Sequence, residues 1–326
     1  MKVVIADKAE QMLIDELGAM GCSVHIDPSL DGDALGACLA EQDASVLVVS
    51  SPKVPAGVID SAGEGLRLII RAGSGYDNID GSAAAAKHIA VCNTPGMNAV
   101  AVAELTIGHL ISLDRRLPDQ NAALKGGRWN NKEYSKARGL KGSTMLVIGA
   151  GAIGQQVIQR ARAFGVEVCV YDPQMTRDEA EGLGVERVGS TRDDLIAALP
   201  RFDAVSMHVP VVESTKGMCD AGFFRAMKDG ASFINTSRGA IADEPALLDA
   251  VGSGRIRAGL DVYCDQPSEK DTAWSPAIAG VEGVFCTHHC GASTDQAQLA
   301  VAEEVVRMVG LFKSDGTIVH CVNGIA

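Results

Sequence analysis

The stretch that decides the fold is TMLVIGAGAIGQQVIQRARAFGVEVCVYD, residues Thr144 to Asp172. Its apolar run, Met145 to Ile148, predicts a buried parallel strand, and the glycine-rich turn that follows opens a helical pattern to about Phe164. A second apolar strand, Val166 to Tyr171, then stops on Asp172. The order strand, glycine turn, helix, strand and acid is typical of a dinucleotide-binding unit.

Each glycine of the turn has a physical reason. Gly149 permits a tight turn, Gly151 lets the backbone approach a pyrophosphate, and Gly154 lets the helix pack closely on the strand. Asp172 falls eighteen residues after Gly154, where its carboxylate can accept hydrogen bonds from both hydroxyls of an adenine ribose. Because the same charge repels a 2′-phosphate, we expect NAD rather than NADP. The alternative interpretation of this stretch is a glycine-rich turn that binds no ligand.

Composition narrows the class of protein. The 326 residues, 47% of them hydrophobic, can bury a large core and suggest two domains. A net charge of −12 argues against a nucleic-acid or anionic-membrane surface. No apolar run is long enough to span a bilayer and the first residues lack a signal-peptide core, so we expect a cytoplasmic protein.

The cysteines indicate reduced thiols rather than a disulfide framework. There are nine, an odd number, and none forms a CxxC pair. Two cysteines and two histidines crowd the segment Cys286 to Cys290, but adjacent side chains of a strand point to opposite faces, so four ligands cannot converge there. We therefore expect no metal.

Short apolar runs and amphipathic segments alternate along the chain, as in an α/β protein. A long helical pattern from Ala99 to about Leu117, with Asn98 as its N-cap, looks like a connector between domains. Another, from Thr294 to Phe312, can lead back to the first domain. We therefore predict one domain from residues 1–98 plus 293–326 and another from 99–292. Further strands are predicted at 2–6, 23–26, 46–49, 66–71, 204–209, 232–235, 258–262 and 284–287, and further helices at 9–20, 36–41, 223–227 and 245–253.

Three late segments follow predicted strands, at the sheet edge where α/β folds bind ligands. Asn235 to Gly239 carries Arg238, whose guanidinium can hold a carboxylate and polarise an adjacent carbonyl. Gly259 to Pro267 and Thr287 to Thr294 follow the next two strands, and the second of them offers His289 for acid–base chemistry. Taken alone, Arg238 could be a surface ion pair and His289 a structural histidine, but their order after a dinucleotide fold favours a catalytic site.

The motifs together resemble the D-isomer-specific 2-hydroxyacid dehydrogenase family, especially its D-3-phosphoglycerate dehydrogenase-like members. The resemblance covers nearly the whole chain, through RAGSGYDNID, NTPGMNAVAVAEL, VIGAGAIG, HVPVVESTKGM, NTSRGAIADEPAL, GLDVY and HHCGAST. It implies two Rossmann-like doubly wound domains with the active site in the cleft between them, NAD as cofactor, and a small anionic 2-hydroxy or 2-oxo acid as substrate. It also implies a homodimer, with the 99–117 helix and the following loop as interface.

The resemblance assigns roles residue by residue. Arg238 would orient the substrate, and His289 would exchange a proton with the substrate oxygen while a hydride passes between substrate C2 and nicotinamide. The backbone N–H groups of Ser74 and Gly75 match those that hold the substrate carboxylate. The candidate substrate contacts are Ser74, Gly75, Asn98, Lys53 and Arg71. The candidate cofactor contacts are Gly149, Gly151, Ala152, Ile153, Gly154, Asp172, Val209, Pro210, Thr236, Ser237, Arg238, Asp261, His289 and Gly291.

Gln266 departs from the family, which usually has a glutamate at this position. A neutral amide orients the ring of His289 without stabilising its protonated form, so we expect a histidine that is more often neutral, which suits oxidation. The glutamine and the stretch from Asp265 to Trp274 also resemble NAD-dependent formate dehydrogenases, which leaves formate as an alternative substrate. A catalytically weak, NAD-sensing interaction protein is the other alternative.

Two further departures bear on the substrate. Phosphoglycerate dehydrogenases commonly place an arginine in the segment that here runs from Val48 to Val54, where Lys53 is the only cation. The chain also ends at Ala326, without a C-terminal regulatory domain. We therefore expect a 2-hydroxy acid without a phosphate, whose identity the sequence does not specify.

Overall fold

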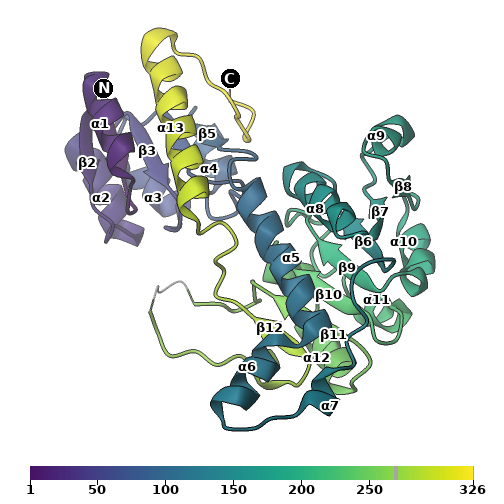
Figure 1. Ribbon diagram of the computed structural model, residues 1–326. Helices are drawn as coiled ribbons and strands as arrows, with labels where there is room; N and C mark the ends of the chain where they lie inside the picture. The colour runs from purple at the N-terminus through teal and green to yellow at the C-terminus, as the bar shows by residue number, and fades with distance from the viewer. Residues whose placement is uncertain (268–270, 326) are drawn as a thin grey trace. The chain divides into compact units, whose positions relative to one another are not determined.

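The computed structural model describes residues 1–267 and 271–325. Its chain divides into two compact units, one formed by Met1–Asn98 with the segment from Ser293 onward, the other by Ala99–Ala292 (Figure 1). Each unit is built on one sheet of parallel strands covered by helices. The predicted α/β class with two doubly wound domains is confirmed.

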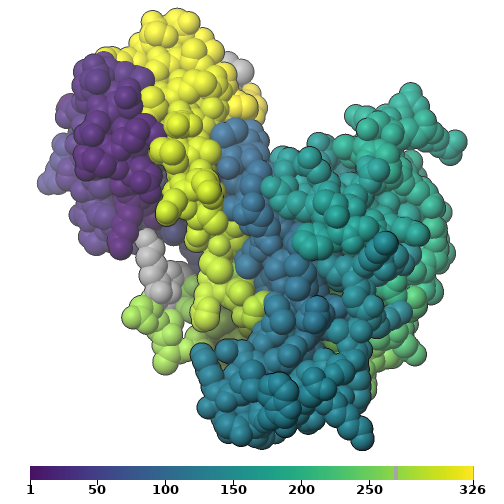
Figure 2. All heavy atoms as spheres, in the orientation of Figure 1, coloured from purple at the N-terminus to yellow at the C-terminus, as the bar shows by residue number. Residues whose placement is uncertain are grey.

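The first unit has a five-stranded sheet in the order β2-β1-β3-β4-β5. Val4 and Leu47 enter the core layer covered by α2 and α3, whereas Val3 and Val46 enter the layer covered by α1 and α13. Figure 2 shows α13 lying along α1. The elements are β1 (Lys2–Ile5), α1 (Gln11–Ala19), β2 (Ser23–Ile26), α2 (Gly32–Gln42), β3 (Val46–Val49), α3 (Ala56–Ser61), β4 (Leu68–Arg71), α4 (Gly81–Ala86), β5 (Ala90–Asn93) and α13 (Asp295–Asp315).

The second unit has a seven-stranded sheet in the order β12-β11-β10-β9-β6-β7-β8. The strand order reverses between β6 and β9, and ligands of doubly wound sheets bind at the carboxyl edge beside such a reversal. The elements are α5 (Ala99–Arg115), α6 (Leu117–Lys125), α7 (Asn131–Tyr134), β6 (Thr144–Ile148), α8 (Ala152–Ala163), β7 (Glu167–Tyr171), α9 (Arg177–Gly182), β8 (Glu186–Arg187), α10 (Arg192–Ala198), β9 (Ala204–Met207), α11 (Ala221–Ala226), β10 (Ser232–Asn235), α12 (Glu244–Gly252), β11 (Arg257–Leu260) and β12 (Val284–Cys286).

Burial on both faces of the sheet explains the unbroken apolar run that predicted β6. Met145 and Val147 enter the core layer under α5 and α8. Leu146 and Ile148 enter the opposite layer, which contains side chains of α10, α11 and α12. A parallel strand covered on both faces needs apolar side chains at every position, so it lacks the alternation of a half-exposed strand.

The structure corrects several predicted boundaries. The long helix α5 ends at Arg115 rather than near Leu117, because Arg116 adopts the left-handed conformation with φ 52° and a new helix, α6, follows. The helix predicted at 36–41 begins earlier, at Gly32, because the side chain of Asp31 accepts a hydrogen bond from the first helical N–H group. The strands predicted at 204–209, 258–262 and 284–287 end at residues 207, 260 and 286. Elements that the sequence analysis did not predict are α3, α4, β5, α6, α7, α9, β8 and α10.

Within the described residues, no helix combines the length and the apolar character needed to cross a membrane. The same residues contain no group of three His, Cys, Asp or Glu side chains arranged to hold a metal ion.

Candidate active site

The glycine turn after β6 has the geometry that its three glycines predict. Gly149 adopts φ 89°, and a Cβ atom there would lie 2.5 Å from the carbonyl oxygen of His208 after β9. A Cβ atom on Gly154 would overlap the carbonyl oxygen of Gly149, so this glycine is required for close packing of α8 on the turn. A Cβ atom on Gly151 would meet nothing within 4 Å, so the space beside it is open to a ligand.

The first turn of α8 provides backbone donors beside that open space. Gly151 is the N-cap of the helix, and no side chain caps it. The N–H groups of Ala152 and Ile153 lie in the first turn and therefore have no intrahelical acceptor. Free N–H groups and the positive end of a helix dipole favour an anion, so this site fits the pyrophosphate of a dinucleotide.

Asp172, at the carboxyl end of β7, reaches back to the glycine turn. Its Oδ2 accepts a hydrogen bond from Ala150 N at 3.0 Å, and its Oδ1 accepts one from Gln174 N at 2.9 Å. Each carboxylate oxygen has a second acceptor position, and the residue is half-buried. Val209 also lies against Gly149, since its Cγ1 is 2.8 Å from the position that a Cβ on Gly149 would take, and the exposed Pro210 follows it. The carboxylate is thus placed beside the turn and can still accept hydrogen bonds from a ribose.

The loop that carries Arg238 is organised by Asn235, a residue only 1% exposed at the end of β10. Asn235 Oδ1 accepts hydrogen bonds from Ser237 N at 3.0 Å and Ser237 Oγ at 2.7 Å, and Nδ2 donates to Arg238 O at 2.8 Å. Thr236 Oγ1 lies 2.9 Å from Thr106 Oγ1 of α5. The half-buried Arg238 donates from Nη1 to Ser237 O at 2.8 Å. Its backbone is therefore held rigidly at the carboxyl edge of the sheet.

Asp261, at the end of β11, holds the loop that carries His289. This carboxylate is 1% exposed. Its Oδ1 accepts hydrogen bonds from Thr287 Oγ1 at 2.6 Å and Cys290 N at 3.0 Å, and its Oδ2 accepts one from Gly291 N at 2.9 Å. Because a buried charge is costly unless donors surround it, these bonds both stabilise Asp261 and determine the path of the loop.

Gln266 and His289 form a direct side-chain pair. Gln266 Nε2 lies 2.5 Å from His289 Nδ1, and Gln266 Oε1 accepts a hydrogen bond from Tyr263 N at 3.3 Å. Since a backbone N–H group can only donate, the amide presents its oxygen to Tyr263 and its NH₂ group to the ring. His289 Nδ1 is then an acceptor, and the neutral ring carries its proton on Nε2.

The loops after β10, β11 and β12 meet at Tyr263. A Cβ atom on Gly239 would overlap the main chain of Tyr263, so the loop carrying Arg238 passes directly against it. Tyr263 OH donates to Thr287 O at 2.8 Å, and burial raises the pKa of this phenol. The sequence-predicted residues Gln266 and His289 are therefore brought together within one connected set of loops.

In the first unit, the turn after β4 presents two backbone donors. Gly73 adopts φ 146°, and Asn93 Nδ2 donates to Ser74 O at 2.6 Å. Ser74 Oγ donates to Asn98 Oδ1 at 2.6 Å. The backbone N–H groups of Ser74 and Gly75 donate to no other residue that the structure describes. They are therefore available to an anionic ligand.

The two cations that we predicted for this unit differ in setting. The guanidinium of Arg71 folds over Gly73, where a Cβ atom would overlap it. Lys53 is exposed in the loop after β3 and forms no ion pair with any described residue. In the same loop, Ser50 N donates to the carboxylate of Asp7 at 2.6 Å. The backbone N–H group of Ser50 is therefore already bound to the negatively charged side chain of Asp7.

The sequence analysis missed residues that support the site from behind. Asn235 had a detectable signal, since it is a polar residue that ends an apolar strand. His109 had none, because it lies within the apolar helix α5; its Nε2 is 3.1 Å from Thr287 Oγ1, and burial lowers its pKa to about 4. Of the stretch that resembles formate dehydrogenases, Ser268, Glu269 and Lys270 lie outside the described residues.

Comparison with known proteins identifies related chains. Residues 107–291 match the family model described as D-isomer specific 2-hydroxyacid dehydrogenase, NAD binding domain. A hydroxypyruvate reductase from Thermotoga maritima is 38% identical over 93% of this chain and 94% of that protein. A D-3-phosphoglycerate dehydrogenase from Methanocaldococcus jannaschii is 38% identical over 95% of this chain, which spans only 57% of that relative. The structure of a glyoxylate reductase from Paecilomyes thermophila, 25% identical, superposes with a TM-score of 0.87 over 99% of this chain and 98% of that one.

Proposed function

Because this chain belongs to the D-isomer specific 2-hydroxyacid dehydrogenase family, we propose that it is an NAD-dependent oxidoreductase acting on a D-2-hydroxy acid or its 2-oxo acid. The observation that supports the proposal is the pairing of Gln266 with His289 at the carboxyl edge of the second sheet. The glycine turn at the same edge fits a dinucleotide. When bound, the nicotinamide accepts the hydride from substrate C2 or returns it. The protein has to bind, orient and protonate the substrate.

Arg238 is the residue that we propose orients the substrate. Its guanidinium presents a planar fork that holds a carboxylate and polarises the adjacent carbonyl oxygen. The rigid attachment of its backbone to Asn235 supports this role, since a fork that is held in place loses less freedom on binding. The N–H groups of Ser74 and Gly75, which donate to no other described residue, would bind a substrate carboxylate, so we propose the first unit as the substrate-binding domain.

His289 would handle the proton. In its neutral form it binds a 2-oxo oxygen through Nε2–H. Proton delivery requires the imidazolium, whose Nδ1–H needs an acceptor, so the amide of Gln266 must rotate and give up its hydrogen bond to Tyr263 N. The same rotation is needed before Nε2 can accept the hydroxyl proton in oxidation. Proton transfer in either direction is therefore coupled to the orientation of Gln266.

We propose a substrate without a phosphate. Lys53 is the only cation in the segment from Val48 to Val54. The carboxylate of Asp7 accepts a hydrogen bond from Ser50 in the same loop and would repel a phosphate. Formate is the second candidate, because a formate donor releases a hydride without a proton and so needs no rotation of Gln266.

The experiment is to follow NADH or NADPH absorbance with NAD or NADP and a panel of donors: D-glycerate, D-lactate, D-3-phosphoglycerate, formate and the L-isomers. We expect turnover of an unphosphorylated D-hydroxy acid with NAD. The matched variant is His289→Asn, since asparagine tolerates the left-handed φ of 51° at this position. It should bind NAD in calorimetry but lose turnover. Turnover of formate alone would favour the second candidate, and NAD binding without any turnover would favour an NAD-sensing interaction protein.

We further propose a homodimer that forms through α6, α7 and the loop between them, the segment from Leu117 to Tyr134. This segment exposes Trp129 by 81% and Leu124 by 56%. Exposed aromatic and aliphatic side chains on one short segment favour a protein–protein contact.

We also propose a cytoplasmic location. The nine cysteines, all free in the structure, suit a reducing compartment.

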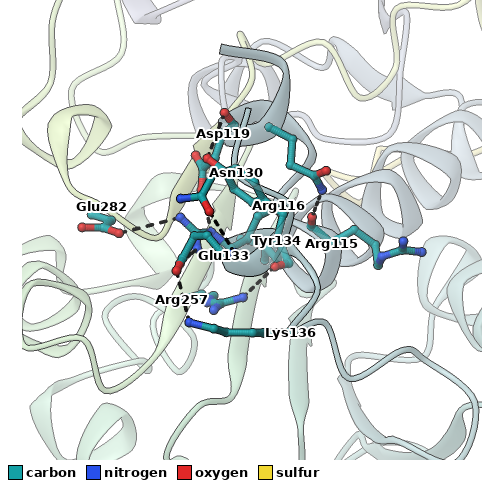
Figure 3. Close-up of polar contacts among 11 residues, drawn as sticks. Arg115, Arg116, Asp119, Asn130, Glu133, Tyr134, Lys136, Arg257 and Glu282 are labelled. Atoms are coloured by element: carbon teal, nitrogen blue, oxygen red, sulfur yellow. Dashed lines mark hydrogen bonds and ion pairs between the residues drawn. The ribbon is translucent and has the colours of Figure 1, made fainter. Parts of the chain in front are cut away.

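Arg116 gives this segment a defined shape (Figure 3). Its Nη1 lies 2.6 Å from Glu133 Oε1 and its Nε 3.0 Å from Asp119 Oδ2. Its guanidinium also lies over the ring of Tyr134, 5.0 Å from the centroid, and these carboxylates raise its pKa. The contacts tie α6 to α7, so Trp129 is presented on a preorganised segment rather than on a loose loop.

A further inference from the structure

The chain after α13, residues 316–325, pairs with the edge strand β5. Val322 N donates to Val91 O at 2.8 Å, and Asn93 N donates to His320 O at 3.3 Å. The side chain of Asn323 continues this pairing, since its Oδ1 accepts a hydrogen bond from Val91 N at 3.0 Å. We call residues 316–325 the C-terminal tail. It forms an isolated antiparallel bridge at the edge of an otherwise parallel sheet.

This register places Cys92 opposite Cys321 in an antiparallel bridge. The two backbone hydrogen bonds flank the cysteine pair instead of joining it, which makes it a non-hydrogen-bonded pair. The Cα atoms of such a pair are about 4.5 Å apart. Disulfides need a Cα separation of roughly 4.4 to 6.8 Å, so the backbone is already placed for a bridge.

The two thiols also share one face of the sheet. Cys92 is fully buried in the core layer under α1 and α13, and the half-buried Cys321 packs against the same layer. Burial, together with the neighbouring Cys321, raises the pKa of Cys92 to about 12. In the reduced protein Cys92 therefore remains a neutral thiol, and Cys321 is the sulfur that a reagent in solution reaches first.

We propose that Cys92 and Cys321 form a reversible disulfide, an oxidation site that locks the C-terminal tail onto the edge of the sheet. The oxidant is a low-molecular-weight disulfide. The Cys321 thiolate attacks one of its sulfurs, the S–S bond breaks, and one small thiolate leaves. The sulfur of Cys92 gives its proton to solvent, attacks the sulfur of Cys321 in the mixed disulfide and expels the second small thiolate. Two protein thiols are oxidised, and the small disulfide is reduced to two thiols.

The Cys92–Cys321 disulfide would affect two regions of the protein. It lies next to Asn93, whose Nδ2 supports the turn at Ser74, so oxidation restrains the strand that carries this turn. It also closes a covalent ring that contains the whole second unit, because the chain leaves the first unit after Asn98 and returns at Ser293. A ring of this size strongly restricts the unfolded chain, so the oxidised protein should be the more stable form. The proposal does not depend on the substrate assignment.

The test is a titration of the full chain in glutathione buffers of increasing oxidised fraction. Free thiols are then alkylated, and peptides are mapped by mass spectrometry. We expect the loss of two thiols, a linked peptide containing Cys92 and Cys321, and a rise in the thermal midpoint of roughly 5 to 10 °C. Dithiothreitol should reverse all three changes. Cys321→Ser should show none of them, whereas the matched variant Cys38→Ser, from the same unit, should respond like the wild type.

Two results would overturn the proposal. One is a wild-type protein that keeps all nine thiols, or stops at a glutathione adduct on Cys321, in the most oxidising buffer. The other is a linked peptide that joins a different pair of cysteines. If Cys321→Ser does not fold, the peptide map of the wild type still decides between these outcomes.

Discussion

At the scale of single residues, the chemistry of the site depends on the amide of Gln266. Its oxygen is occupied by Tyr263 N at 3.3 Å, and its NH₂ group faces His289 Nδ1 at 2.5 Å. A glutamate at the same position would accept a hydrogen bond from Nδ1–H and add a Coulombic attraction to the imidazolium. The glutamine therefore reverses the hydrogen bond to the ring and removes the charge that would favour its protonated form.

We predict that Gln266→Glu raises the pKa of His289. Because reduction of a 2-oxo acid needs the protonated ring, the upper limb of the pH profile of kcat/KM for reduction should move upward by about one pH unit. The control is Gln266→Met, which has similar length but neither charge nor amide and should not move that limb upward. An identical profile for the wild type and the glutamate variant would contradict the hypothesis.

Sequence reasoning could pair Gln266 with His289 but could not orient the pair. The pairing follows from the resemblance, because Gln266 lies three residues after the GLDVY segment, at the position where the family usually has a glutamate. The orientation depends on Tyr263 N, which lies in the irregular chain after β11, where strand alternation no longer places atoms. The same irregularity places Asp265 in an exposed position, while Gln266 faces the ring.

At the scale of elements, helix α5 supports the loop after β12 through a buried chain of hydrogen bonds. Thr287 Oγ1 has one hydrogen, which it donates to Asp261 Oδ1 at 2.6 Å. It must therefore accept a hydrogen bond from His109 Nε2, which lies 3.1 Å away. Burial lowers the pKa of His109 and so keeps the ring neutral, and among the described residues its Nδ1 has no hydrogen-bond partner. The loop that carries His289 is therefore supported by a buried histidine that must remain neutral.

We predict that this arrangement makes stability depend on pH. Burial lowers the pKa of His109 from 6.5 to about 4, so between these values the unfolded chain binds a proton that the folded protein excludes. Stability is full above pH 6.5 and is lost as the pH falls toward 4, by about 3 kcal/mol for this group. Urea unfolding at several pH values measures it. His109→Gln, whose amide can still donate to Thr287, should remove the part of this dependence that His109 contributes, while the part from His208, whose pKa burial lowers to about 3, remains.

The control for this prediction is His88→Asn, which replaces an exposed histidine whose φ of 57° asparagine tolerates. It should show the pH dependence of the wild type. If His109→Gln shows it as well, the loss of stability in acid arises from other groups.

The strands that sequence reasoning placed well are the continuously apolar ones. The strands β3, β6 and β10 are buried on both faces, so nearly every side chain of each run is apolar. The break between α5 and α6 was not predictable, because Arg116 is an ordinary helix residue in most settings. Its left-handed conformation is compatible with its contacts to Asp119, Glu133 and Tyr134, which form only in the folded chain.

At the scale of the whole molecule, the alternation of strands and helices predicted two parallel sheets, and the structure contains them. The alternation of strands and helices did not predict two features of the structure. The C-terminal tail pairs with β5 across more than two hundred residues of sequence, a contact that no local signal encodes. The segment from Leu117 to Tyr134 was predicted as helix end and loop, yet it folds into two short helices around Arg116. Both features depend on partners that are distant in sequence.

The exposed face of the segment from Leu117 to Tyr134 leads to a prediction about assembly. Large aromatic side chains contribute most of the affinity of many interfaces, so Trp129→Ser should raise the dissociation constant of the homodimer at least about tenfold. Sedimentation velocity over a range of protein concentrations measures it. Phe164→Ser is the matched control, because Phe164 is also exposed, by 48%, but lies at the end of α8. A wild-type protein that sediments as a monomer, or equal weakening by both substitutions, would exclude this segment as the specific interface.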